Sequence, residues 1–324
     1  MSAPARPQAA PAVRAVGSAA LGWALAHRRD FTLGEDALAE HGDVNRTWKP
    51  LGELAQVCVS VRRATAPDDP LHATASDLLA YAWELTGQGA YFHELLRLEP
   101  FGTYALEVYA AFASAGLRHP GFEKLAATTV ATRSWRLTEQ QPNRRLGLLN
   151  SERRVGLPQH RPVADALRAT WLGGLPEPWT FESASGYSLT HVVFHLTDWG
   201  GDPSGVPGDV ASYLGLWLPA WLDSCVEDDQ WDLACELLAV AGALPEPPGV
   251  DLLAGVWHAV AAAQDADGSL PEVGPGRRGR PVPRDFAGRY HSTLMAAFAA
   301  ALALPRRGGG PRGAAPHAEE GVQA

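Results

Sequence analysis

The sequence is poor in cysteine and in charge, and both shortages narrow the classes of protein it can form. Only three cysteines, Cys58, Cys225 and Cys235, occur in 324 residues, too few and too unevenly placed for a disulfide framework. Charged side chains make up 19% of the chain and apolar ones 46%, so a large core can form and global disorder is excluded. We therefore expect a folded protein of the reducing cytoplasm.

Long hydrophobic runs and basic clusters are missing as well. The longest apolar stretch, near 294–304, is shorter than a bilayer requires, so no transmembrane helix is expected. With 27 basic against 36 acidic residues the net charge is −9, and no block of Lys and Arg stands within the periodic segments. Nucleic acid and anionic membranes are therefore disfavoured as partners, which leaves a small-molecule or peptide substrate.

Signature motifs of several large enzyme classes are absent. The sequence has no Gly-x-x-x-x-Gly-Lys-Ser/Thr phosphate loop, no Gly-x-Gly-x-x-Gly after a predicted strand, no Gly-x-Ser-x-Gly elbow and no Cys-x-x-Cys pair. Nucleotide-binding, dinucleotide-binding and serine-hydrolase functions are therefore disfavoured.

What the sequence does have is helical periodicity, with almost no strand pattern. At least ten segments repeat apolar residues at the spacing of one helix face. They are 15–29, 50–64, 75–98, 102–116, 121–133, 162–173, 188–199, 209–224, 229–241, 250–264 and 286–304. Short separators rich in Pro and Gly make neighbouring helices antiparallel. We predict one all-α domain over 14–304, with ten to twelve helices in about six hairpins, between disordered tails at 1–13 and 305–324.

Such helices can form an open solenoid or a closed α/α toroid, and a solenoid should show a repeat of fixed period, which we do not find. The run Gln264-Asp265-Ala266-Asp267-Gly268-Ser269-Leu270 resembles the Gln-x-x-x-Gly-Ser-Trp turn of triterpene cyclases, with Leu270 where that family has Trp. Arg284-Asp285-Phe286 and Tyr290-His291-Ser292-Thr293-Leu294 resemble the end of protein prenyltransferase β-subunits, in which a Tyr-His-Thr run opens the last inner helix and its His binds zinc. Both families are α/α toroids, so the resemblance implies that fold.

The inner helices of such a toroid run parallel, so their N-termini gather at one rim of a central funnel. If 286–304 is inner and the layers alternate, 229–241 and 188–199 are inner too, whereas 250–264 and 209–224 are outer. The first turns of the inner helices then bring together Thr190, His191, Trp231, Asp232, Tyr290 and His291. Free N–H groups and positive helix ends at this rim favour an anionic substrate group.

One predicted helix carries the densest set of chemical groups. His191, His195 and Asp198 are spaced i, i+4 and i+7, hence on one face of 188–199. Two imidazoles and a carboxylate are ligands for a divalent metal such as zinc or iron, with His291 as a further ligand or base. A polar site without metal, or purely structural roles, are the alternatives. Zinc-protease chemistry is excluded, because Val192 stands where His-Glu-x-x-His needs its Glu.

A second acidic pair lies on the next predicted inner helix. Asp232 and Glu236 share a face at i, i+4. If they point inward, they are a general acid/base pair or metal ligands. The alternative is a capped and solvated helix start.

The helix with His191 and Asp198, together with Tyr290-His291, also resembles an uncharacterised bacterial family of α/α-toroid proteins associated with natural-product gene clusters. This resemblance implies a tailoring enzyme of specialised biosynthesis, working by metal-assisted or His/Asp acid–base chemistry. The residues expected to act are His191, His291, Asp232 and Tyr290 in catalysis, Trp199, Trp231 and Thr190 in substrate binding, and His191, His195, Asp198 and His291 in metal binding. The alternatives are a non-catalytic toroid that binds a peptide or partner protein, and a prenyltransferase-like or cyclase-like enzyme.

Overall fold

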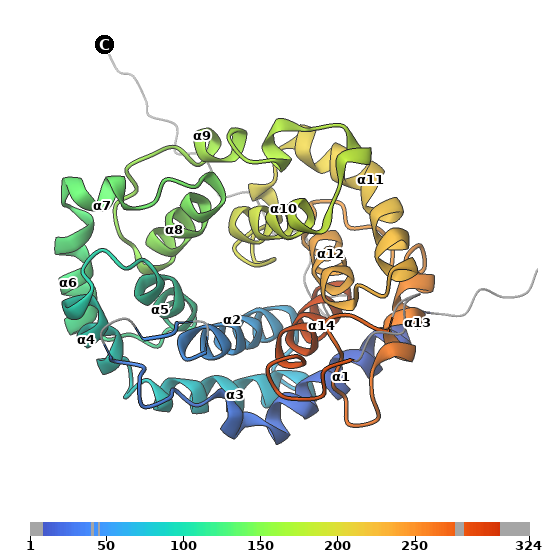
Figure 1. Ribbon diagram of the computed structural model, residues 1–324, viewed down its shortest axis with the longest axis horizontal. Helices are drawn as coiled ribbons and strands as arrows, with labels where there is room; N and C mark the ends of the chain where they lie inside the picture. Colours follow the sequence, from blue (N-terminus) through green and yellow to red (C-terminus); the bar gives the residue numbers. More distant parts are fainter. Residues whose placement is uncertain (1–8, 40–41, 45, 276–281, 305–324) are drawn as a thin grey trace, which may run out of the picture.

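A computed structural model describes residues 9–39, 42–44, 46–275 and 282–304, and within these ranges the chain forms fourteen α-helices and no strand. Six helices form an inner ring: α2 (Trp48–Ala64), α5 (Tyr104–Ser114), α8 (Pro142–Val155), α10 (Ser183–Leu196), α12 (Trp231–Ala243) and α14 (Tyr290–Ala303). Each contacts the next in that order, and α14 contacts α2, so the ring is closed (Figure 1). The predicted all-α toroid is confirmed.

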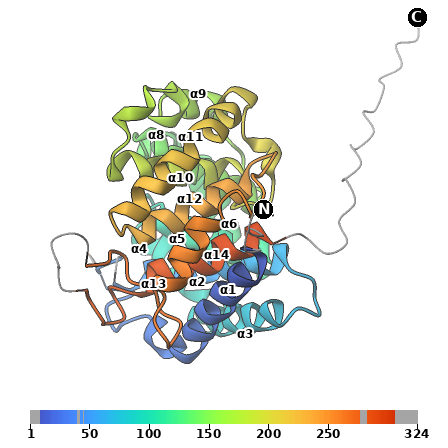
Figure 2. The same ribbon diagram turned by 90° about the vertical axis from the view of Figure 1, so that its right-hand side faces the viewer.

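The remaining helices form an outer layer around the ring (Figure 1). They are α1 (Ala9–Ala26), α3 (Pro70–Leu85), α4 (Ala90–Leu98), α6 (Pro120–Val130), α7 (Arg133–Thr138), α9 (Val163–Arg168), α11 (Gly208–Glu227) and α13 (Ala254–Ala263). From the side, α11 and α13 lie nearest the viewer and cover α12 (Figure 2). The predicted alternation of inner and outer helices therefore holds in the second half of the chain.

Three differences in the first half make the number of helices larger than predicted, and one of them is the additional short helix α7. The segment 75–98 forms two helices, because Gly87, Gln88 and Gly89 have positive φ angles of 59°, 53° and 91° and break the chain direction. The inner helix α8 was missed altogether. Its buried residues include Arg145, Asn150, Ser151 and Glu152, so it lacks the apolar stripe that marks an ordinary core helix.

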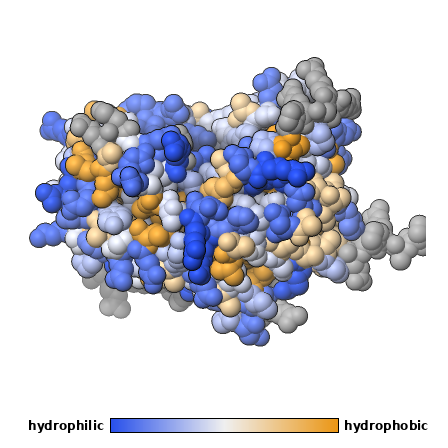
Figure 3. Space-filling model, turned by 60° about the horizontal axis from the view of Figure 1, so that its bottom comes forward, coloured by the Kyte–Doolittle hydropathy of each residue, from blue (hydrophilic) through white to orange (hydrophobic). Residues whose placement is uncertain are grey.

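The N-terminal helix also starts earlier than expected. Helix α1 begins at Ala9, and Val13 is fully buried, so residues 9–13 are helical rather than part of a tail. The segments 1–8 and 305–324 lie outside the described residues. Among the described helices, α1 is long and apolar enough, over 18 residues, to cross a membrane by length and composition alone. In the toroid α1 packs against α14, α13 and α3, and the face of the molecule seen in Figure 3 mixes hydrophilic and hydrophobic residues.

Side-chain contacts show that the inner helices run parallel. Near their starts, Tyr187 of α10, Asp232 of α12 and His291 of α14 are linked by hydrogen bonds. At their other ends, Arg154 of α8 and Arg63 of α2 both pair with Asp198, which follows α10. The rim at the helix starts and the floor at the helix ends are therefore built from different side chains of the same six helices.

Candidate functional site

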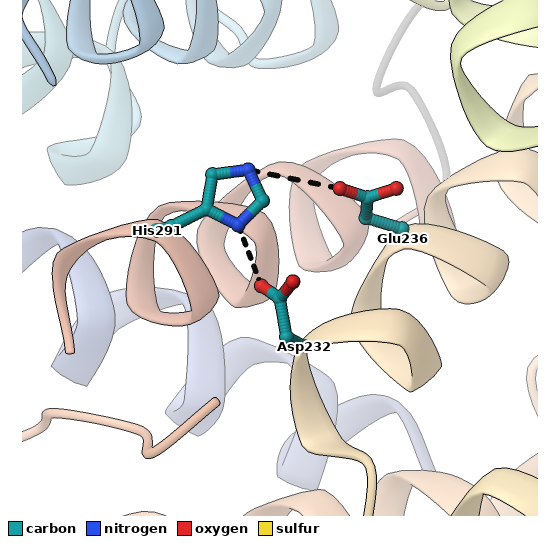
Figure 4. Close-up of side chains that lie close together, drawn as sticks. All are labelled: Asp232, Glu236 and His291. Atoms are coloured by element: carbon teal, nitrogen blue, oxygen red, sulfur yellow. Dashed lines mark hydrogen bonds and ion pairs between the residues drawn. The ribbon is translucent and has the colours of Figure 1, made fainter. Parts of the chain in front are cut away.

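A compact cluster of two carboxyl groups and one imidazole lies where α12 and α14 begin (Figure 4). His291 Nδ1 is 2.7 Å from Asp232 Oδ1, and His291 Nε2 is 3.6 Å from Glu236 Oε1. Each of the three residues offers one ligand atom, and these atoms lie within 4.8 Å of one another. Among the described residues this is the only group of three or more His, Cys, Asp and Glu side chains that fits a metal ion.

The sequence places these groups through two local features. Asp232 and Glu236 are four residues apart near the start of α12, so they share the face that meets α14. The backbone N–H of Asp232, one of the free donors of a first helical turn, donates to Glu272 O at 3.0 Å. His291 occupies the second position of α14. Of the two alternatives for Asp232 and Glu236, the structure has both side chains buried rather than solvated.

Helix α10 fixes both carboxyl groups from the neighbouring position in the ring. The hydroxyl of Tyr187 donates to Asp232 Oδ2 at 2.9 Å, and the hydroxyl of Thr190 donates to Glu236 Oε2. Both acidic side chains are buried, Asp232 at 4% and Glu236 at 0% exposure. Their orientation is therefore set by two hydroxyl groups that lie three residues apart on one helix.

Helix α2 contributes a third carboxyl group. Glu53 Oε1 lies 3.7 Å from His291 Nε2, on the side of the central cavity that Glu53 itself lines. Burial, and then the carboxylate charge of Glu53, raise the pKa of Tyr290. Tyr290, predicted as catalytic, therefore lies close enough to Glu53 for the charge of that carboxylate to affect it.

The cluster holds more carboxyl groups than imidazoles, and this raises the pKa values of His291 and Glu236. Burial by itself lowers the pKa of His291, but the carboxylates of Asp232, Glu53 and Glu236 outweigh burial and raise it to about 10. Burial and then the charge of Asp232 raise the pKa of Glu236 to about 8, against the opposite effect of His291. Both groups therefore hold protons at neutral pH when no other cation is near.

Two carboxylate oxygens of this region are left without a hydrogen-bond partner. They are Glu236 Oε1 and Glu53 Oε2, both buried. A buried carboxylate oxygen without a donor is costly, and a metal ion is one group that satisfies it. The 3.6 Å from Glu236 Oε1 to His291 Nε2 is too long for a hydrogen bond, but it is shorter than the sum of typical zinc–nitrogen and zinc–oxygen bonds, about 4.1 Å. One ion can therefore bond to both atoms.

A cavity of about 400 Å³ occupies the funnel beside this cluster. Its walls come from α2, α5, α8 and α10 and from the residues that flank them. The polar lining residues are Lys49, Glu53, Gln56, Tyr104, Glu107, Arg144, Asn150, Ser151, Arg154, His191 and His195. This volume suits a small molecule or the end of a peptide.

The predicted metal set of His191, His195 and Asp198 is not assembled. Asp198 is held in ion pairs with Arg63 at 2.8 Å and Arg154 at 3.2 Å. Helix α10 ends at Leu196, and Asp198 has a positive φ of 49°, so its side chain leaves the face that His191 and His195 share. The i+7 spacing continues past the end of α10, so the structure does not bring Asp198 together with the two histidines.

The two histidines of α10 line the cavity but do not join the cluster. The imidazole rings of His191 and His195 are 6.2 Å apart and nearly perpendicular. Burial in the funnel wall lowers the pKa of both imidazoles. The charge of His291 lowers the pKa of His191 further, and the charge of His191 does the same to His195. Both are therefore neutral groups of the cavity wall at pH 7.

Three residues predicted to bind substrate lie in different places. Trp199 lines the cavity and stacks on Phe194. Thr190 is fully buried and is engaged with Glu236, so it orients a member of the cluster. Trp231 is packed near Gly274, and it is not among the residues that line the funnel cavity.

Sequence reasoning missed Glu53 and Tyr187. Glu53 lies in the predicted helix 50–64, which is not one of the three predicted inner helices whose first turns form the rim. Tyr187 was taken to precede a helix at 188–199, whereas α10 begins at Ser183. The rim itself is also more acidic than expected, because carboxyl groups outweigh the positive helix ends there. The anionic substrate group predicted for this rim stays a prediction.

The fold and the cluster define a helical toroid with a carboxylate–histidine centre beside a polar cavity. A family model described as a domain of unknown function (DUF6895) matches residues 17–301, and the chain belongs to that family. No curated protein and no solved structure matches the chain.

Proposed function

We propose that the chain is an enzyme that holds a divalent metal ion in the Asp232–Glu236–His291 cluster and acts on a small or peptidic substrate in the funnel. The observation that carries the proposal is Glu236 Oε1, an oxygen of a fully buried side chain that has no hydrogen-bond partner and lies 3.6 Å from His291 Nε2. No described residue satisfies this oxygen, whereas an ion between the two atoms would.

Charge supports the same proposal. Protons on Glu236 and His291 occupy the positions that a cation would take, and metal binding displaces protons from its ligands. The hydrogen bond that Nδ1–H donates to Asp232 fixes the imidazole ring and leaves Nε2 for the ion, an arrangement common around metal-bound histidine. Glu53 approaches the same nitrogen from the cavity side.

The donor set suits a first-row transition ion such as zinc or iron, because it combines carboxylates with one imidazole. An ion in this place supplies Lewis-acid polarisation of a substrate or of bound water. Glu53 stands between the cluster and the cavity and is placed to move a proton to or from a group in the funnel. We further propose that the reaction is a tailoring step of specialised biosynthesis, as the sequence resemblance implies.

Metal analysis of purified, tag-free protein by inductively coupled plasma mass spectrometry tests the proposal. We expect about one equivalent of metal in the wild type and little in Glu236→Gln and His291→Ala, because each variant removes a ligand. Glu227→Gln, an exposed residue at the end of α11, is the matched control and should keep its metal. Absence of metal after reconstitution with zinc and with iron(II), or equal metal in all four proteins, would contradict the proposal.

A further inference from the structure

The wall of the funnel is divided by charge. Helix α8 contributes to the cavity only side chains that can donate hydrogen bonds, Arg144, Asn150, Ser151 and Arg154. The acidic lining residues, Glu53 and Glu107, come from α2 and α5. Arg144 is already paired with Glu107, through bonds of 2.7 and 2.9 Å. The other arginine of α8 that lines the cavity is Arg154, which lies near the end of the helix and so farther from the acidic rim.

Arg154 is a buried cation with incomplete partners. Its side chain is 4% exposed, and it donates to Gln56 Oε1 at 2.5 Å and to Ser114 Oγ at 2.8 Å. Its Nε lies 3.2 Å from Asp198 Oδ1, yet neither atom has a hydrogen-bond partner, because the two are poorly aligned. A guanidinium has five N–H donors and these bonds use two, so Arg154, which lines the cavity, retains donor capacity.

A second unsatisfied group lies on the same wall. His195 Nδ1 is buried and has no hydrogen-bond partner. The imidazole packs against Gly147 of α8, where a Cβ atom would lie 3.0 Å from His195 Nε2, so the glycine makes room for the ring. Of the seven buried side-chain atoms without partners among the described residues, those of Glu53, Arg154 and His195 belong to cavity-lining residues. Arg154 and His195 therefore both bring an unused polar atom to residues of the funnel wall.

The position of Arg154 sets the shape of a ligand that reaches both sites. Gln56, which binds Arg154, follows Glu53 by three residues on α2, so the guanidinium lies about 5 Å deeper along the funnel axis than Glu53. A ligand of a few bonds' length can span this distance within a cavity of about 400 Å³.

We infer that the funnel binds a small molecule with an anionic group, a carboxylate or a phosphate, which Arg154 and His195 receive near the floor while the rest of the molecule faces Glu53 and His291. The statement that one end of this ligand reacts beside the metal cluster rests on the proposed function. The anion-binding end does not, because it uses none of the residues of the metal cluster.

Isothermal titration calorimetry with three probes tests the inference: inorganic phosphate, glutarate, and the uncharged glutaramide as a control of the same length. We expect saturable binding of at least one anion and none of glutaramide, with phosphate and glutarate distinguishing the two anion classes. Arg154→Gln should weaken anion binding at least about tenfold, because a desolvated charge partner is lost. Arg168, 48% exposed and paired with Asp209 away from the cavity, gives the control Arg168→Gln, which should bind normally.

Asn150→Asp keeps the result decisive if Arg154→Gln does not fold. The new carboxylate still accepts the 2.8 Å hydrogen bond from Arg153 but adds a negative charge to the cavity wall, so anion binding should fall by a similar factor. Glu236→Gln should bind the anion as the wild type does, so loss of metal and loss of anion binding are distinguishable. Binding of neither anion, equal binding of glutaramide, or full affinity in Asn150→Asp would overturn the inference.

Discussion

The hydroxyl of Tyr187 donates to Asp232 across the interface between α10 and α12, and this bond leaves the other oxygen of Asp232 for His291. The series Tyr187, Asp232 and His291 therefore fixes the ring at Nδ1 and turns Nε2 toward Glu236 and Glu53. In the proposed metal centre, Tyr187 acts through Asp232 and is a positioning residue.

Tyr187→Phe tests this relationship, because it removes the hydroxyl and keeps the packing of the ring. We expect metal affinity to fall by about 10-fold to 100-fold, as for other groups that orient a ligand, with little change in stability. Competition with a chromophoric chelator measures the affinity. Tyr213→Phe is the control, since its hydroxyl donates to Pro176 O far from the cluster. Unchanged affinity in Tyr187→Phe would remove the positioning role.

Asp198→Asn separates a structural role from the metal role first predicted for this residue. Asp198 pairs with Arg154, and without the carboxylate a buried guanidinium is left uncompensated. We expect a loss of about 2–4 kcal/mol in the free energy of unfolding, below the full value for a buried pair because Asp198 is 17% exposed. Asn tolerates the positive φ here, so the backbone should be kept.

Urea unfolding and metal analysis of Asp198→Asn together decide the assignment. Metal content should equal that of the wild type. The control is Asp202→Asn, at a residue 47% exposed and 3.9 Å from Arg153, for which we expect less than about 0.5 kcal/mol. Loss of metal in Asp198→Asn with unchanged stability would restore the original prediction.

Two glycines of α1 provide a matched test of how closely the outer layer packs. A Cβ atom on Gly17 would lie 2.8 Å from the Cβ of the buried Ala300 in α14, whereas one on Gly22 would meet nothing within 4 Å. We expect Gly17→Ala to destabilise the protein by about 1–3 kcal/mol through overpacking. Gly22→Ala should stabilise it by about 0.5–1 kcal/mol through helix propensity. Stabilisation by both substitutions, measured by urea unfolding, would show that α1 is not in close contact with α14.

The neutral state of His195 predicts sensitivity to acid. Burial, then the charges of His191, Arg144 and Arg154, lower its pKa well below 6.5, so in the native state it binds fewer protons than in the unfolded chain. Its contribution to stability is therefore present above pH 6.5 and is lost as the pH falls below that value. His195→Gln should lose less Tm than the wild type between pH 6.5 and about 5. Parallel Tm curves for the two proteins would contradict the assignment.

Much of the fold was predictable from local pattern, and the exceptions have one cause. Helices with an apolar face, such as α12 and α14, were placed correctly, and alternation then assigned them to the inner layer. Helix α8 was missed because its inner face meets a polar cavity and carries arginine and asparagine. Apolar periodicity does not reveal a helix whose inner face is polar because it lines a cavity.

The candidate site was half predictable for the same reason. His291, Asp232 and Tyr290 were expected because residues in the first turn of an inner helix must reach the rim. Glu53 was not, because nothing near it in sequence reveals that α2 stands beside α14 when the ring closes. The hydroxyl of Thr190 was assigned to substrate, whereas its proximity to Glu236 depends on the rotation of α10 about its own axis.

The sequence by itself determined the helical class, the spacing of Asp232 and Glu236 on one face, and the place of His291 at a helix start, because these depend on interactions within a few residues. Only the tertiary structure decided that Glu53 joins them, that Asp198 pairs with arginines, and that Arg154 lies buried beside the cavity. Those contacts join residues of different helices, and the closure of the ring and the points at which helices end set their distances.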